Sequence, residues 1–516
     1  MARRRATPKG RRKRKWRKAA GRLALRAAKA GAGALLAYLT ERTRGRRPAA
    51  VAGQAEPEPR PAEARAQPKE DDPTRTIPNR HDVVVFGAGP AGNTAAYLLA
   101  RKGLDVLLIE RGPVPGSKSI GGASLYVQTW LWAVPELVPA LFEEHPYERV
   151  ITRQEFWFLT EDCMVNMGVS GPAFARPPYN RLSALKSRLD PWMAGKAVQA
   201  GATLLSGYRV DQVIKNGGRA VGVRVDHEVD TGSGKTRDLF ADVVVVAEGV
   251  NPIVSHRAGY VKLPKATTQT LYVKETFALP PEEISRRLGC PGDEGAVIGI
   301  YGYPSAGLNG TGSIYTNRES IGINVGASVD GLAKAGLNPN QFLERVKAHP
   351  SFRRLLEGSK TIEYSAHLIP DAGFNDVPKL VHDGAVILGD TACLCNGIYG
   401  IVPAMVSASA AAEAIFAAKE RGDFSRKGLK SYAELLSRTF AWRDLRINRM
   451  AAGFLQKHPR VFDLSTSALA AAAHAGAMSY AETSRQRRWR ILRSVRRVAP
   501  LSRLLREAAE AAWVEY

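Results

Sequence analysis

Residues 81–92 read HDVVVFGAGPAG, an apolar run that leads directly into a turn with three glycines. The run Asp82–Phe86 has the composition of a short, buried parallel strand. After the turn, residues 93–102 are rich in alanine and leucine and predict a helix, which Gly103 ends. The stretch therefore predicts a strand, a tight glycine turn and a helix in direct succession.

Each glycine of the turn has its own physical role. Gly87 allows the sharp turn, Gly89 lets the backbone approach a pyrophosphate, and Gly92 lets helix and strand pack closely. A second apolar run, Leu104–Ile109, ends at Glu110, 18 residues after Gly92. An acid at that position can accept hydrogen bonds from ribose hydroxyls, while the helix N-terminus attracts phosphate. This spacing predicts a Rossmann-type dinucleotide-binding unit.

Two distant segments decide between NAD and FAD. Phe240–Gly249 reads as a strand that returns to the nucleotide sheet and ends in a turn of small residues. Gly384–Leu388 reads as another strand, and the Asp390 carboxylate shortly after it can bind the ribityl hydroxyls of a flavin. The alanine-rich helix predicted over residues 403–418 would direct its positive end at the flavin ring and stabilise the anionic reduced form. The sequence therefore predicts FAD, although Asp390 taken alone could also be an ordinary helix-capping acid.

The net charge of +25 on these 516 residues is concentrated in the tails. Residues 1–80 hold 23 Lys/Arg against 7 Asp/Glu and residues 481–516 hold 9 against 4, which leaves +4 for the body between them. We therefore predict tails that contact an anionic surface rather than a basic enzyme body. Both tails interleave apolar and basic residues, which favours a membrane surface over nucleic acid; a solvated tail is the alternative.

Composition also divides the chain into regions. Residues 46–79 are rich in Pro, Ala, Glu and Arg and lack apolar periodicity, which is typical of a disordered linker. The expected fold class is α/β with an α+β substrate domain, in which an antiparallel sheet is inserted into a Rossmann-type FAD-binding domain. The expected regions are a basic, largely disordered extension (1–79), the FAD-binding domain (80–260 and 360–425), the substrate domain (261–359), and a helical C-terminal region with an Arg-rich tail (426–516).

Cysteines and apolar runs limit the remaining options. Four cysteines, Cys163, Cys290, Cys393 and Cys395, cannot form a disulfide framework in so long a chain, which indicates a reducing compartment. No CxxC pair is present, so we expect no iron–sulfur or structural metal site. No run reaches the roughly 20 apolar residues of a transmembrane helix, and we expect no cleaved secretory signal. The expected location is cytoplasmic, peripheral on the inner face of the cell membrane.

Several further motifs resemble one known family. They include GAGPAGNTAAYLLARKGLDVLLIERG at 87–112, the turn Pro115–Lys118 and the helix start Arg188–Trp192. The most specific stretch is Glu363–Pro370, followed by Gly373-Phe374-Asn375. On these motifs, residues 80–470 resemble FixC, the electron-transfer-flavoprotein:quinone oxidoreductase branch of the geranylgeranyl-reductase-like flavoproteins.

The resemblance implies that an electron-transfer flavoprotein reduces the FAD and that a quinone at the membrane accepts the electrons. It also implies a separate small ferredoxin-like partner that carries an iron–sulfur cluster. His367, in the family-specific stretch, is a candidate proton donor to the reduced quinone, and a structural histidine is the alternative. Tyr301 and Tyr303 are either cavity residues or strand aromatics. A prenyl reductase, an NAD(P)H-dependent flavin monooxygenase, and a polyanion- or membrane-binding protein with a vestigial flavin domain remain alternative functions.

The sequence departs from the family at two places. The family commonly has Arg where Lys186 stands, so either Lys186 or Arg188 is expected to contact FAD. It usually has small residues where Cys393 and Cys395 stand; these two are expected to be packing residues, or to tune the flavin potential. The residue pattern and the resemblance together predict these cofactor contacts: Gly87, Gly89, Pro90, Ala91, Gly92, Glu110, Arg111, Lys118, Lys186, Arg188, Val210, Gly249, Gly389, Asp390, Gly397, Ile398 and Gly400.

Overall fold

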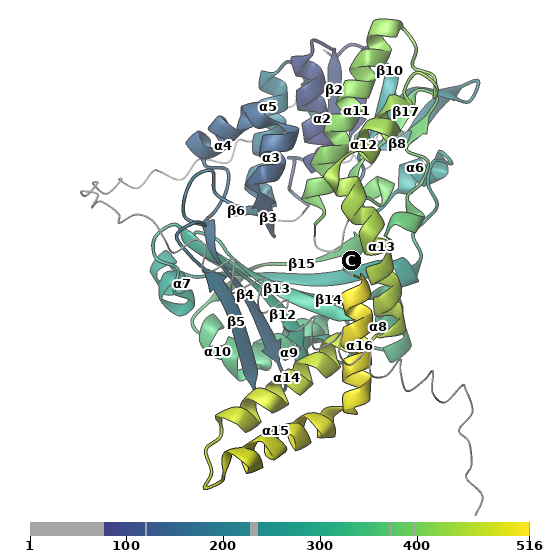
Figure 1. Ribbon diagram of the computed structural model, residues 1–516. Coiled ribbons are helices and arrows are strands. Elements are labelled where there is room, and N and C mark those ends of the chain that lie inside the picture. Colours follow the sequence, from purple (N-terminus) through teal and green to yellow (C-terminus); the bar gives the residue numbers. More distant parts are fainter. Residues whose placement is uncertain (1–76, 119–120, 228–235, 372, 396–398, 515–516) are drawn as a thin grey trace, which may run out of the picture. The chain divides into compact units, whose positions relative to one another are not determined.

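The predicted strand and glycine turn lie at the centre of a mostly parallel sheet (Figure 1). The computed structural model describes residues 77–118, 121–227, 236–371, 373–395 and 399–514. The predicted basic extension therefore lies almost entirely outside the described residues, as do Gly397 and Ile398. In the described part this first sheet has eight strands: β16 (Val381–His382), β17 (Ala385–Ile387), β10 (Thr236–Val246), β1 (Arg80–Phe86), β2 (Val106–Glu110) and β7 (Thr203–Ser206), with β9 (Arg219–His227) beside β10 and β8 (Tyr208–Asn216) beside β9.

The strands from β17 to β7 are all parallel, so their carboxyl ends meet at one edge of the sheet. The middle of β1, Val83–Val85, is fully buried. Alanines on α2 and α11 let these two helices pack together closely. The helices of this part are α2 (Pro90–Arg101), α3 (Val127–Ala133), α4 (Val138–Glu144), α5 (Lys186–Gln199), α6 (Ile253–Arg257), α11 (Ile401–Arg421) and α12 (Ser431–Ser437).

A second sheet of nine described strands forms the other half of the fold. One of its faces is apolar and packs against α9 and α10 through residues such as Ile298, Ile323 and Phe352. The sheet order is β15 (Lys360–Pro370), β11 (Gln269–Ala278), β14 (Ser320–Ser328), β13 (Gly310–Thr316), β12 (Glu294–Gly302), β4 (Val150–Leu159), β6 (Arg181–Leu185) and β3 (Gly122–Tyr126), with β5 (Met164–Ser170) beside β4. Its helices are α7 (Pro281–Leu288), α8 (Val329–Ala335), α9 (Asn340–Ala348) and α10 (Pro350–Leu356).

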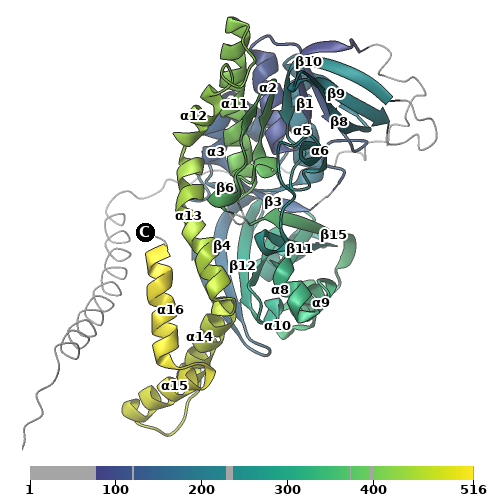
Figure 2. The same cartoon turned by 90° about the vertical axis from the view of Figure 1, so that its right-hand side faces the viewer.

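Helices form most of the described C-terminal region. Figure 2 shows α13 to α16, green to yellow, following one another on one side of the second sheet. Among them α14 contacts β4 and β12, and α15 packs on α14. Their bounds are α13 (Phe440–Lys457), α14 (Val461–Ala477), α15 (Ser484–Val498) and α16 (Leu501–Val514).

The fold class is confirmed, but the second sheet is larger than the predicted substrate domain. It includes β3 to β6 from residues 122–185 and β15 from residues 360–370, all outside the predicted range 261–359. It is also mixed, because β4 pairs with β12 in parallel. These pairings join distant parts of the chain, which local sequence patterns do not reveal.

One described helix, α11, is long and apolar enough to cross a membrane by length and composition alone. Most of its apolar stretch is buried inside the protein, against α2 and the parallel sheet. We therefore interpret α11 as a core helix.

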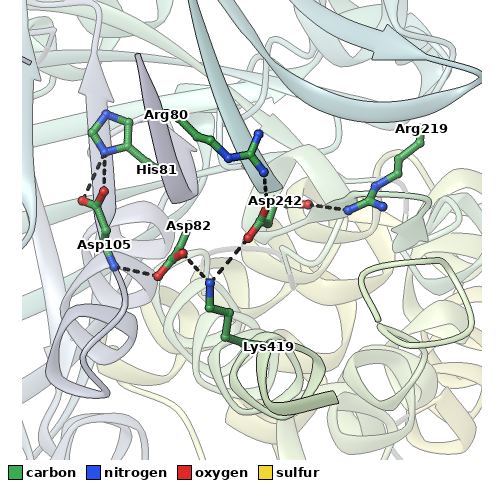
Figure 3. A network of polar contacts seen from close by, with 7 residues as sticks. All are labelled: Arg80, His81, Asp82, Asp105, Arg219, Asp242 and Lys419. Atoms are coloured by element: carbon green, nitrogen blue, oxygen red, sulfur yellow. Dashed lines mark hydrogen bonds and ion pairs between the residues drawn. The ribbon is translucent and has the colours of Figure 1, made fainter. Parts of the chain in front are cut away.

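The amino edge of the parallel sheet carries a network of charged side chains (Figure 3). Lys419 of α11 lies 2.5 Å from Asp82 and 3.5 Å from Asp242. Asp82 also accepts the backbone N–H of Asp105 at 3.1 Å, and Arg80 lies 2.5 Å from Asp242. Such partly exposed pairs contribute about 0–1 kcal/mol each, so the network ties α11 to β1 and β10 with a small gain in stability. His81, bonded to Asp105, and Arg219 complete the network.

Candidate cofactor and substrate site

A cavity of about 740 Å³ lies where the carboxyl ends of the parallel strands meet one face of the second sheet. We call it the main cavity. The first sheet contributes the glycine turn and Glu110, and the second sheet contributes polar side chains from β11, β13, β14 and β15. Crevices at the carboxyl ends of parallel strands are where open α/β sheets bind their ligands.

The glycine turn has the geometry that the sequence predicts. Gly87 has φ +101°, and a Cβ there would lie 2.1 Å from the carbonyl oxygen of Ala247. A Cβ at Gly92 would lie 1.8 Å from the carbonyl oxygen of Gly87. At Gly89, which precedes α2, a Cβ would meet no atom within 4 Å, and no side chain caps the helix. Gly87 and Gly92 thus permit the fold, while Gly89 leaves the free N–H groups of α2 open to an anion.

Two backbone N–H groups hold the Glu110 carboxylate, one in the glycine turn and one just after β2. Its Oε2 accepts the N–H of Ala88 at 2.9 Å, and its Oε1 accepts the N–H of Gly112 at 2.8 Å. Nearby, Asn93 donates to the carbonyl oxygens of Ala88 at 2.9 Å and Asp190 at 3.1 Å. A fixed carboxylate beside the glycine turn can still accept hydrogen bonds from ribose hydroxyls through its free lone pairs.

Asp390 also lines the main cavity, and it lies in the short 3₁₀ turn Gly389–Ala392. Burial raises its pKa, and the nearby Lys186 and Lys118 act against this shift. The N-terminus of α11 opens on the same cavity through Gly400 and Ile401, and no side chain caps it. The carboxylate and the free helix end therefore line the same cavity.

Lys186 and Arg188 were predicted as alternative contacts to FAD. Of these two, only Lys186 lines the main cavity. Its Nζ lies 2.8 Å from Asp190 Oδ2, whereas the Arg188 guanidinium bonds to Glu148 at 3.0 Å. Gly92 and Gly389 support the wall without lining it, and Gly397 and Ile398 lie outside the described residues. The predicted residues that line the cavity are Gly87, Gly89, Pro90, Ala91, Glu110, Arg111, Lys118, Lys186, Val210, Gly249, Asp390, Gly400 and His367.

His367 lies on β15 and lines the main cavity. Burial, followed by the nearby Lys274, Lys118 and Lys186, lowers its pKa to about 3. The imidazole is therefore neutral at physiological pH and has no extra proton to donate. This favours the alternative of a structural histidine, and the proton-donor role stays a prediction.

A second cavity of about 430 Å³ adjoins the main one. Its walls include the aromatic and apolar side chains of Phe156, Val169, Phe174 and Tyr301. Tyr303 does not line it. The Tyr303 ring packs instead against the Arg345 guanidinium, at 4.1 Å from the ring centre. Both cavities are lined by Tyr126, Arg181, Tyr272, Ser313, Tyr315, Asn324 and Tyr399.

Several cavity residues were not predicted from the sequence. Lys274 and Asn324 stand opposite each other on β11 and β14, with side chains on the polar face of the second sheet. Asp190 and Arg181 also line the main cavity. The alternation of polar and apolar residues along each strand indicates that the strand has two different faces. Which face lines the cavity follows only from the register of the strands.

Cys395 also lines the main cavity, and burial raises the pKa of its thiol well above the ordinary value. Burial raises the pKa of Cys393 to about 11 as well. Both thiols are therefore protonated and unreactive at neutral pH, which favours the packing interpretation. Among the described residues, no group of three or more His, Cys, Asp or Glu side chains could hold a metal ion.

FAD fits the lining of the main cavity. The space beside Gly89 leaves room for a pyrophosphate at the N-terminus of α2, and the Glu110 carboxylate at the end of β2 lines the same cavity, where it would accept hydrogen bonds from a ribose. Asp190 lines the cavity, and its buried Oδ1 has no hydrogen-bond partner among the described residues. This oxygen can accept a hydrogen bond from a polar ligand. Each residue's contact with FAD stays a prediction.

Comparisons with known proteins agree with this geometry. Residues 82–245 match the family described as FAD dependent oxidoreductase. The chain is 37% identical over 388 residues to the probable electron transfer flavoprotein-quinone oxidoreductase YdiS of Escherichia coli K12, covering 74% of this chain and 87% of the relative. It is 40% identical over 374 residues to protein FixC of Azorhizobium caulinodans, covering 72% and 83%.

Among solved structures, a geranylgeranyl bacteriochlorophyll reductase-like protein from Thermoplasma acidophilum aligns with a TM-score of 0.58 at 19% identity, covering 82% of this chain and 97% of that one. The halogenase CndH aligns with a TM-score of 0.56 at 18% identity, covering 82% and 92%. At these identities the likeness shows the fold alone.

The fold and its main cavity define an FAD-dependent oxidoreductase. Bound FAD takes up electrons from a donor and releases them to an acceptor, while the protein positions it and tunes its electronics. The chain belongs to the FixC family of electron-transfer-flavoprotein–quinone oxidoreductases.

Proposed function

We propose that this chain passes electrons from an electron-transfer flavoprotein, through FAD, to a quinone. The observation that carries the proposal is the second cavity, which adjoins the main cavity and shares seven lining residues with it. An acceptor in the second cavity would therefore lie close to the end of FAD that reaches the second sheet. The name of the relative YdiS, a probable electron transfer flavoprotein-quinone oxidoreductase, supports the same donor and acceptor.

The lining of the second cavity suits a quinone ring. Phe156, Val169 and Tyr301 offer apolar and aromatic surface to a flat ring. Arg181 stands at the boundary of the two cavities, with its Nε 2.8 Å from Ser124 Oγ and its guanidinium over the Tyr126 ring at 4.9 Å. A fixed guanidinium can donate a hydrogen bond to a quinone carbonyl oxygen.

The test is a change in the apolar wall that leaves the main cavity intact. Phe156 is 39% exposed, so Phe156→Lys is compatible with folding. An ammonium on this wall disfavours an apolar ring, and we expect KM for a ubiquinone analogue to rise about ten-fold, or about 1.4 kcal/mol. The rate at which reduced electron-transfer flavoprotein reduces the FAD should not change. The measurement is steady-state quinone reduction together with single-turnover reduction of the flavin.

Val114→Lys is the matched control, because Val114 is 50% exposed and lines neither cavity. It should leave KM unchanged. An unchanged KM in Phe156→Lys would remove the second cavity as the quinone site. A slower reduction of the flavin in that variant would show that the wall serves the donor instead.

We include a small ferredoxin-like protein with an iron–sulfur cluster among the partners, as the family resemblance implies. The four cysteines contain no CxxC pair, so the cluster would have to be carried by another chain. Co-purification with subunits expressed from neighbouring genes tests this partner, and a fully active preparation without any iron would exclude it.

We also propose that the basic tails hold the enzyme at a membrane surface on the cytoplasmic side. Among the described residues α15 supports this, because none of its residues is buried, its arginines are mostly exposed, and Trp489 is 48% exposed. Arginines near an anionic leaflet contribute about 1 kcal/mol each.

Flotation with vesicles tests the part of α15 in this binding. The triple change Arg488→Glu, Arg493→Glu and Arg496→Glu should weaken binding to phosphatidylserine-containing vesicles at least ten-fold, because it reverses three exposed charges. The pair Arg353→Glu and Arg354→Glu, exposed on α10, is the control and should bind normally. Equal flotation of all these forms would remove α15 from the membrane-binding surface.

A further inference from the structure

Lys274 places a positive charge in the middle of an otherwise uncharged strand face. It lies on β11, where Val273 and Phe277 point into the apolar core and Tyr272 and Lys274 point into the main cavity. In the sheet it stands between Asn324 of β14 and Ser365 of β15. Lys274 is half-buried and its side chain opens on the main cavity, so a polar or anionic ligand bound there can offset its charge.

The protein supplies little compensation for this charge. Among the described residues no hydrogen bond or ion pair to the Lys274 ammonium is present. The charged and titratable groups around it are Lys186 from α5, His367 from β15 and Glu363 from β15, of which only Glu363 is an acid. Glu363 has its own contact with Thr276 at 3.3 Å. Burial, followed by Lys186, lowers the pKa of Lys274 to about 8, so the side chain is still mostly charged at neutral pH.

The position of Lys274 along the cavity indicates which part of FAD it faces. The adenosine end is assigned to Glu110 and the pyrophosphate to the N-terminus of α2, both on the first sheet. Lys274 lies on the opposite wall, formed by the second sheet. Since FAD is an elongated molecule, a nucleotide end held at the first sheet would bring its ring system toward this wall.

We propose that Lys274 is a positioning residue that stabilises the negative charge that the flavin ring acquires on reduction. A flavin that takes up two electrons from its donor and one proton from solvent gains one negative charge. The Lys274 ammonium, unpaired on the facing wall, offsets that charge in a cavity of low dielectric constant, where charges interact strongly. Lys274 thereby raises the reduction potential of the bound cofactor. This inference depends on FAD binding and on neither the donor nor the acceptor, so it stands even if the proposed function is wrong.

The experiment compares Lys274→Met with the wild-type holoenzyme. Methionine keeps the length of the side chain and removes the charge. Sulfite, which adds to oxidised flavin and leaves a negative charge on the ring, is the probe. We expect its Kd to rise at least ten-fold in Lys274→Met. We also expect a lower midpoint potential in a dye-equilibrium titration, by about 30 mV for each ten-fold change in the equilibrium of a two-electron couple.

Two further variants separate charge from packing. Lys274→Arg keeps the charge and should retain sulfite binding within about three-fold of wild type. Lys360→Met removes an exposed lysine from the same sheet and should change neither quantity. Unchanged sulfite affinity and potential in FAD-loaded Lys274→Met would overturn the proposal. Equal losses of sulfite affinity in Lys274→Met and Lys274→Arg would also overturn it, because the charge would then not matter. A failure of both Lys274→Met and Lys274→Gln to bind FAD would overturn it too, because Lys274 would then act by holding the cofactor.

Discussion

Gly92→Ala should yield a protein that binds less than one tenth of the wild-type FAD and unfolds at a much lower temperature. A Cβ at this position would lie 1.8 Å from the carbonyl oxygen of Gly87, which is backbone and cannot move without opening the turn. Overpacking of this kind costs about 1–3 kcal/mol when side chains can adjust, and more when backbone must move. The measurements are the ratio of FAD to protein after purification and the thermal unfolding midpoint.

Gly89→Ala is the matched control for this prediction. A Cβ at Gly89 meets no atom within 4 Å, and its backbone has an extended conformation that alanine adopts readily. This variant should fold with a wild-type unfolding midpoint in the apoprotein and bind FAD more weakly, because the methyl group occupies the approach to the pyrophosphate. A yellow, normally stable Gly92→Ala protein would contradict the account of this turn.

Arg149→Met should lower the free energy of unfolding by about 3 kcal/mol or more, because three buried carbonyl groups lose their donor. Arg149 is 1% exposed and directly precedes β4, whose parallel pairing with β12 begins at Val150 and Glu294. Its guanidinium donates to the carbonyl oxygens of Asn317 at 2.6 Å, Gly292 at 3.0 Å and Glu294 at 3.0 Å. Methionine leaves these buried acceptors without donors, and each unsatisfied group costs about 1–3 kcal/mol.

Urea unfolding followed by circular dichroism measures this loss. The control is Arg209→Met, since Arg209 pairs with Asp226 at 3.0 Å on the surface and its side chain is 50% exposed. Surface pairs of this type contribute about 0–1 kcal/mol, so the control should stay close to wild type. A loss below about 1 kcal/mol in Arg149→Met would show that the carbonyl groups find other donors.

The parts of the site that follow from local sequence were predictable. The strand, glycine turn and helix around Gly87–Gly92 depend on neighbouring residues, and so does the position of Asp390 between a strand and a helix. Lys186 and Arg188 could not be separated, because residues two apart on a helix point in nearly opposite directions and the cavity side depends on tertiary packing. The structure turns Lys186 to the cavity and Arg188 to Glu148.

The second sheet shows where sequence patterns stop being informative. Its strand order places β4 beside β12, although more than 130 residues of chain separate them. The sequence also did not predict which face of β11 lines the cavity, since a one-residue change in register would turn Lys274 from the cavity to the apolar core. Nonlocal pairing decides both features.

Electron transfer from a flavoprotein donor through FAD to a quinone is tested most directly by anaerobic stopped-flow mixing of the FAD-loaded enzyme with reduced electron-transfer flavoprotein. We expect the oxidised-flavin absorption band of the enzyme to be lost on mixing and to return when ubiquinone is added. The claim is contradicted if the band persists with the flavoprotein, or if NADPH alone bleaches it quickly and quinone does not restore it.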